Sequence, residues 1–103
     1  MKLQMSSIKF DADVKLLEFI QKKADKLDTF FDRIIDGDVN LLIDNKDSQE
    51  NKVVEMKINV PGASFFAKET SKSFEAATDL AVEALRRQLK KHKGKLIDRH
   101  QEI

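Results

Sequence analysis

Cysteine, tryptophan and tyrosine are absent from this sequence of 103 residues, which contains one proline and three glycines. Without cysteine the chain can form no disulfide, no thiolate zinc site and no cysteine nucleophile. No run of 18 apolar residues is present, so no segment is predicted to span a membrane. The first ten residues also lack the apolar stretch of a signal peptide. We therefore expect a single cytoplasmic domain that covers residues 1–103.

Catalytic and metal-binding patterns are also missing. The three glycines form no phosphate-binding motif. Residues 44–47 have some of the polar residues of a calcium loop, but Lys46 and the lack of a sixth-position glycine break that pattern. His92 and His100 lie in a basic segment, and His92 falls on an apolar stripe, where a packed histidine is expected. We expect no enzyme, no catalytic residue, no metal, no cofactor and no small-molecule substrate.

The periodicity of the N-terminal half predicts two strands separated by a helix. Residues 2–10 alternate between apolar and polar and indicate a strand. Asp13 is predicted to cap a helix from Val14 to about Phe31, whose apolar residues recur at steps of three and four. Residues 39–43 alternate again as a second strand, and Asp36 and Asp38, which flank a glycine, are typical of a turn.

The C-terminal half predicts two more strands and a long helix. Residues 54–60 alternate most regularly, and Pro61-Gly62 indicates a turn into a short strand at residues 64–69. Ser73 is predicted to cap a helix that reaches at least His92. The order is β-α-β-β-β-α. One apolar face on the sheet and one apolar stripe on each helix predict an α+β fold, a two-layer sandwich with a four-stranded sheet and both helices on one face.

Charge is distributed unevenly along the chain, although its net value is only +1. Residues 1–85 hold 12 Lys and Arg against 16 Asp and Glu, whereas residues 86–103 hold 7 against 2. A helix dipole accounts for one or two cations in a last turn. It does not account for seven cations within residues 86–99, where like charges four residues apart repel each other. A polyanionic partner would relieve that repulsion, so the cluster predicts contact with nucleic acid.

The first helix adds a weaker basic stripe on its predicted solvent side, formed by Lys15, Lys22, Lys26 and Arg33. If the helices pack side by side, this stripe would lie beside the basic face of the second helix. The two together would form a cationic groove suited to a phosphate backbone. A sheet that reads RNA with stacked aromatic rings is disfavoured, because the chain has no Trp or Tyr and only Phe65-Phe66 put an aromatic residue on each strand face. Recognition by backbone shape and charge is expected.

Residues 73–96 resemble the C-terminal helix of the ribosome hibernation promoting factor and ribosome-associated inhibitor family, most closely in the Arg-Gln-Leu-x-Lys-His-Lys stretch at 87–93. Residues 27–34 resemble the end of that family's first helix, and the element order agrees. The resemblance implies binding to the small ribosomal subunit in the mRNA and tRNA channel near the decoding region, which promotes ribosome hibernation in stationary phase or starvation. It implies small-subunit rRNA as the partner and allows a separate ribosome-dimerising factor.

The resemblance and the helical wheel together nominate the RNA-binding residues. The resemblance assigns rRNA contacts to five basic residues: Lys23, Lys26, Arg87, Lys91 and Lys93. The wheel adds Arg86 and Lys90, and Lys22 and Lys95 are further candidates. The predicted set is Lys22, Lys23, Lys26, Arg86, Arg87, Lys90, Lys91, Lys93 and Lys95.

Two departures from the family pattern affect individual contacts. Ala84 stands where many members have lysine, and Leu17 stands where arginine is common. Because the sequence ends at Ile103, without the additional domain or the acidic tail of other members, the short hibernation promoting factor is the better match. Two other interpretations stay open: a general double-stranded RNA-binding domain, and a protein-interaction module whose basic helix docks on an acidic partner.

Overall fold

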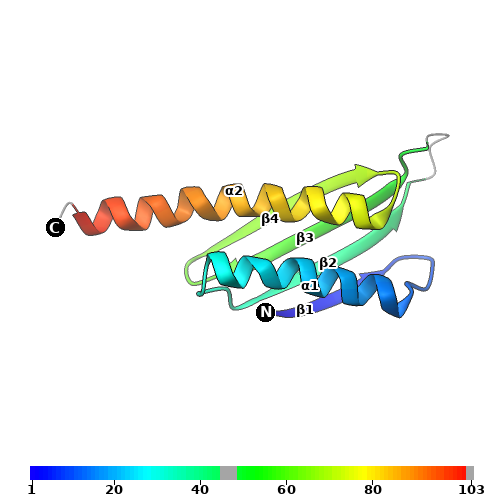
Figure 1. Cartoon of the computed structure of the whole chain (residues 1–103), viewed down its shortest axis with the longest axis horizontal. Helices are drawn as coiled ribbons and strands as arrows, with labels where there is room; N and C mark the ends of the chain where they lie inside the picture. Colours follow the sequence, from blue (N-terminus) through cyan, green and yellow to red (C-terminus); the bar gives the residue numbers. More distant parts are fainter. Residues whose placement is uncertain (45–48, 102–103) are drawn as a thin grey trace.

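The computed structural model describes residues 1–44 and 49–101, with side chains as far as residue 94. Residues 45–48, which include most of the segment with the broken calcium-loop pattern, therefore lie outside the described residues. The element order is the predicted β-α-β-β-β-α. The elements are β1 (Lys2–Ser7), α1 (Val14–Phe30), β2 (Asp36–Ile43), β3 (Lys52–Val60), β4 (Ala63–Ser71) and α2 (Phe74–Gln101) (Figure 1).

The four strands form one mixed sheet in the order β1-β2-β3-β4. Strands β1 and β2 are parallel, and the other neighbouring pairs are antiparallel. A parallel pair needs a long crossover, which α1 supplies. Both helices lie side by side on one face of the sheet and run in the same direction, and α2 continues beyond the end of α1 (Figure 1). The predicted two-layer α+β sandwich is confirmed.

Both predicted helix caps are present. The Asp13 carboxylate accepts a hydrogen bond from the backbone N–H of Lys15 at 3.4 Å, and the Ser73 hydroxyl accepts one from Ala76 at 3.1 Å. Each side chain satisfies a backbone donor that the first turn of a helix leaves without a partner. The turn between β3 and β4 places Gly62 at φ +79°, a conformation that glycine adopts without steric cost.

The hydrophobic core lies between the two helices and the sheet. Leu27 comes from α1, Leu85 and Leu89 come from α2, and Met56 and Ile58 come from β3. All five side chains are almost completely buried, with at most 1% of their surface exposed. The steps of three and four on the helices and of two on the strand are therefore the steps that core packing requires.

The predicted turn at residues 36–38 is wrong, because these residues lie within β2. Gly37 pairs with Leu3 of β1 on one side and with Ile58 of β3 on the other. A Cβ atom added to Gly37 would lie 2.8 Å from Cδ2 of Leu3 and 2.9 Å from the carbonyl oxygen of Lys57. The glycine thus serves a close approach inside the sheet, a use that local sequence does not distinguish from a turn.

Two glycine-to-alanine substitutions should change stability in opposite directions. Gly37→Ala should lower the free energy of unfolding by about 1–3 kcal/mol, because the methyl group overlaps neighbouring atoms. Gly94→Ala should raise it by about 0.5–1 kcal/mol, because this residue lies in α2 with open space around the added atom. Urea denaturation measures both values. A stable Gly37→Ala variant would contradict the close packing described for β2.

Candidate nucleic-acid interface

The second half of α2 presents cations away from the core, both on its outer side and beside α1. Leu85 and Leu89 are fully buried against the sheet. The cationic side chains between and after them are exposed, as the helical wheel predicts. They are Arg86, Arg87, Lys90, Lys91 and Lys93. The side chains of the predicted contact Lys95 and of His100 lie outside the described part of the structure.

Two lysines of α1 extend this surface across the seam between the helices. Lys26 lies three residues after Lys23 and four before Phe30, and both of those residues contact α2. Lys26 therefore lies on the side of α1 that faces α2, and Lys22 lies one turn before it. Both side chains are exposed. We call the exposed cations of the two helices the basic face: Lys22, Lys26, Arg86, Arg87, Lys90, Lys91 and Lys93.

Lys23 differs from the other predicted contacts because it already has a partner. Its ammonium lies 3.2 Å from the Asp79 carboxylate of α2, and 30% of its side chain is exposed. The same ammonium lies 5.4 Å from the centre of the Phe19 ring. A partly exposed pair of this kind stabilises a protein by about 0–1 kcal/mol. Lys23 joins the helices, and its positive charge is balanced within the seam.

The basic-face cations form no ion pairs within the described part of the chain. Among the described residues, no carboxylate lies within 4.0 Å of the charged atoms of the seven basic-face side chains. On the β1 side of α1, the amino group of Met1 contacts Asp25 at 3.1 Å and also Asp28. The hydrogen bond to Asp28 raises the pKa of this amino group above its ordinary value, with a smaller contribution from Asp25. Two acids of α1 are thus engaged by the N-terminal amino group on the side of β1.

Two other residues of the Arg-Gln-Leu-x-Lys-His-Lys stretch, Gln88 and His92, hold α2 against its neighbours. The Gln88 amide donates to the carbonyl oxygen of Phe66 on strand β4 at 3.0 Å. The His92 ring packs edge-on against Phe31 and Phe65, with centroids 5.8 and 5.3 Å apart. This confirms the expectation of a packed histidine. Gln88 and His92 set the position of the helix, and the cations between them project outward.

Phe30 is a contact that the sequence reasoning did not identify. Arg86 and Lys93 both place their charged groups 5.3 Å from the centre of this ring. The ring is half-buried at the end of α1, where its neighbour Phe31 joins the core. The only sequence signal is the spacing of three residues from Leu27, at the edge of the apolar stripe.

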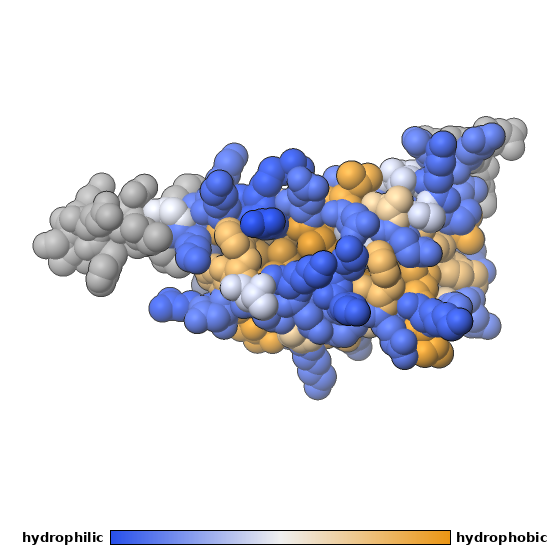
Figure 2. Space-filling model, viewed as in Figure 1, coloured by the Kyte–Doolittle hydropathy of each residue, from blue (hydrophilic) through white to orange (hydrophobic). Residues whose placement is uncertain are grey.

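The hydropathy of the surface agrees with the separation of buried apolar residues from exposed charged ones. Hydrophilic side chains cover most of the visible face over both helices, and hydrophobic atoms show between them (Figure 2). No helix in the described residues is long and apolar enough to cross a membrane. The same residues contain no group of three or more His, Asp or Glu side chains that could hold a metal ion.

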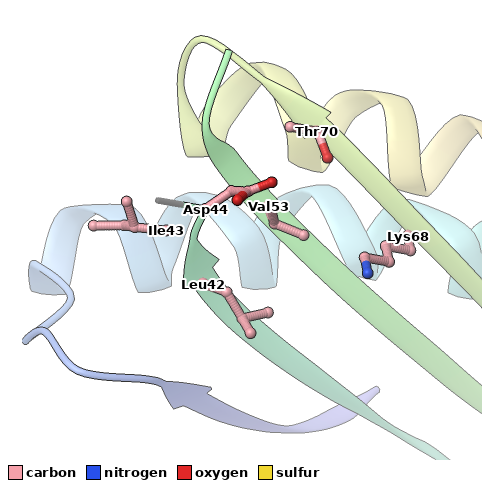
Figure 3. Close-up of a pocket in the computed structure, with 6 residues that line it drawn as sticks. All are labelled: Leu42, Ile43, Asp44, Val53, Lys68 and Thr70. Atoms are coloured by element: carbon pink, nitrogen blue, oxygen red, sulfur yellow. The ribbon is translucent and has the colours of Figure 1, made fainter. Parts of the chain in front are cut away.

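A shallow hollow lies on the other face of the sheet, at the end away from the basic residues of α2. Leu42 and Val53 lie side by side there on β2 and β3, with Lys68 and Thr70 beside them on β4 (Figure 3). Ile43 and Asp44 complete its lining. The lining has one basic and one acidic side chain and no histidine, and nothing in it converges on a reacting atom.

Comparison with known proteins identifies related sequences. Residues 3–97 match the family described as Sigma 54 modulation protein / S30EA ribosomal protein. A ribosome hibernation promotion factor from Deinococcus radiodurans is 32% identical over 100 residues, which cover 96% of this chain and 52% of that protein. A ribosome hibernation promoting factor from Azotobacter vinelandii is 31% identical over 101 residues, which cover 98% and 91%. The chain thus spans about half the length of the first relative and nine-tenths of the second.

Two solved structures share the fold. A ribosomal subunit interface protein from Coxiella burnetii has a TM-score of 0.80 at 26% identity, over 91% of this chain and 99% of that one. The N-terminal domain of Protein Y from Thermus thermophilus has a TM-score of 0.77 at 22% identity, over 89% and 99%.

The Lys23–Asp79 pair predicts that a carboxylate in the seam lowers the affinity of the basic face for RNA. Asp79→Asn should tighten binding to single-stranded RNA by about two- to fivefold at 0.1 M salt, because it removes a negative charge and releases Lys23. Asp38→Asn makes the same charge change on the face of the sheet away from the helices, where Asp38 is an exposed residue of β2 next to the buried Val39, and should leave affinity almost unchanged. Fluorescence anisotropy with a labelled RNA measures both. Equal gains in the two variants would show that net charge matters and the seam does not.

Proposed function

The chain belongs to the Sigma 54 modulation protein / S30EA ribosomal protein family, and from this premise we propose that it is a cytoplasmic translation inhibitor. Residues 1–103 form one ribosome-binding domain whose basic face binds rRNA of the small ribosomal subunit, in the mRNA and tRNA channel near the decoding region. By occupying the channel it excludes mRNA and tRNA and promotes ribosome hibernation in stationary phase or starvation.

One observation carries this proposal: the five cations on residues 86–93 are exposed, and none has a carboxylate partner among the described residues. The names of the relatives and the family resemblance support the choice of the ribosome, and the resemblance supports the choice of the channel. The charge pattern supports the choice of surface. Like charges one turn apart destabilise a helix by about 0.2–0.5 kcal/mol a pair, and phosphate groups between them would remove that cost.

Recognition of the backbone follows from the chemistry of the side chains. Arg86 and Arg87 can each present two parallel N–H donors to one phosphate, whereas the lysines act as point charges. Each phosphate that is neutralised releases bound counterions, so binding should weaken steeply as salt rises. The open face of the sheet offers little for base stacking, because Phe66 is its one strongly exposed aromatic residue among those described. The helical layer is the better candidate for RNA contact.

The shape of the molecule supports binding inside a channel. Its principal extents are 54 × 24 × 18 Å, and α2 projects past the end of the sheet and past α1 (Figure 1). The basic residues therefore lie along an elongated body near its projecting end. Inhibition by occupancy needs no catalytic group, and none is proposed.

The two alternative functions make different predictions. A general double-stranded RNA-binding domain would bind arbitrary duplexes as tightly as small subunits. A protein-interaction module would retain its partner in an extract treated with nuclease, whereas rRNA binding would not survive that treatment.

A separate ribosome-dimerising factor stays a predicted partner, and sedimentation of ribosomes with and without such a factor would test it.

Charge reversal on α2 should abolish ribosome association. The variant Arg87→Glu, Lys91→Glu, Lys93→Glu should lose at least about 100-fold in affinity for small subunits, because it sets like charges against phosphates. Co-sedimentation through a sucrose cushion measures the loss, and circular dichroism checks the fold.

The matched control makes the same charge change on the open face of the sheet. Lys2, Lys57 and Lys68 are exposed strand residues, and their replacement by glutamate should leave most of the binding intact. Co-sedimentation of the α2 variant at the wild-type level would show that another surface binds the ribosome.

A further inference from the structure

Phe30 is the last residue of α1, and it contacts two cations of α2 at once. The Arg86 guanidinium carbon and the Lys93 ammonium nitrogen each lie 5.3 Å from the ring centroid. The two cations are seven residues apart, two helical turns, so they project on the same side of α2. Lys93 also donates a hydrogen bond to the backbone carbonyl of Phe30 at 3.3 Å.

Both parts of Phe30 attract positive charge for physical reasons. The negative face of an aromatic ring attracts a cation that lies within about 6 Å of its centroid. The Phe30 carbonyl belongs to the last turn of α1, where carbonyls lack helical partners and the helix dipole favours a cation. Helix α1 has no basic residue in its own last turn. Lys93, from the neighbouring helix, therefore supplies the positive charge at this end.

The seam between the helices uses two different ways to hold a cation. Lys23 is held by the carboxylate of Asp79, which cancels its charge. Arg86 and Lys93 are held by a ring and a carbonyl, which restrict their movement and leave the charge intact. Ammonium and guanidinium groups have three and five N–H donors, so most donors stay available to a ligand. An aromatic anchor is thus suited to cations that must meet an anion.

We propose that Phe30 is a positioning residue of the basic face, which holds Arg86 and Lys93 ready to meet two neighbouring phosphates. This inference rests on the proposed rRNA binding. Pre-ordering lowers the conformational entropy that the two long side chains lose on binding. Phe30 itself does not contact RNA in this arrangement.

The first test removes the ring and keeps an apolar side chain. Phe30→Leu should weaken binding to small ribosomal subunits about five- to tenfold, since each cation loses its contact with the ring. Phe30→Tyr keeps the ring and should restore affinity to within about twofold of the wild type. Phe30→Met serves as a second variant without the ring, should the leucine variant fold poorly.

The matched control is Phe19→Leu. Phe19 is also a half-buried α1 aromatic beside a lysine, but that lysine is paired with Asp79. Phe19→Leu should change thermal stability as much as Phe30→Leu does and should leave ribosome affinity unchanged. Equal losses of affinity in the two leucine variants would overturn the proposal, because the effect would then follow from general loosening of the helix pair.

A double-mutant cycle separates positioning from direct contact. In a background of Arg86→Gln and Lys93→Gln, Phe30→Leu should have no further effect on affinity, because the residues it positions are gone. An additive loss would show that the ring touches RNA and would overturn the proposal. If the glutamine pair binds like the wild type, the proposed basic face itself is wrong. If the pair binds weakly and Phe30→Leu binds normally, only the role of Phe30 is wrong.

Discussion

The burial of Leu85 and Leu89 against the sheet is the interaction on which the rest of this surface depends. Once this pair is fully buried, the rotation of α2 about its own axis is set, and residues on the opposite side must face solvent. Gln88 and His92 secure the same orientation through strand β4 and the end of α1. A rotation of α2 would bury arginine and lysine side chains at great energetic cost. Core packing therefore controls where positive charge appears.

The clustered cations of α2 lower the stability of the isolated domain, and this cost points to a ligand that neutralises them. Closely spaced cations on α2 repel each other, and the carboxylate at Asp79 relieves only the seam around Lys23. Phe30 attracts Arg86 and Lys93 but leaves their positive charge in place, because an aromatic ring has no net charge. Arrangements that lower stability, such as clustered like charges, occur most often at functional sites, where a ligand can supply the opposite charge. Phosphate is the ligand chemistry that the proposed function supplies at this surface.

Local features of the sequence were sufficient to predict most of the fold. The caps at Asp13 and Ser73, the alternation in β3 and the apolar steps of α2 all depend on neighbours within a few residues. Features that depend on distant contacts escaped prediction. The local sequence around Gly37 predicts a turn, because the approach of Leu3 and Lys57 is a property of the assembled sheet.

The candidate site divides in the same way. The exposed cations of α2 follow from its own periodicity, so the helical wheel found them. The engagement of Lys23 by Asp79, and of Arg86 and Lys93 by Phe30, depends on how the two helices meet.

The absence of cysteine now has a practical use, because a thiol-linked photo-crosslinker can be attached at one chosen position. Crosslinking to small subunits from Glu83→Cys on α2, compared with Lys57→Cys on the open face of the sheet, tests most directly which face meets rRNA. Strong crosslinks to rRNA from position 83 and weak ones from position 57 are expected, and the reverse pattern would contradict the proposed basic face.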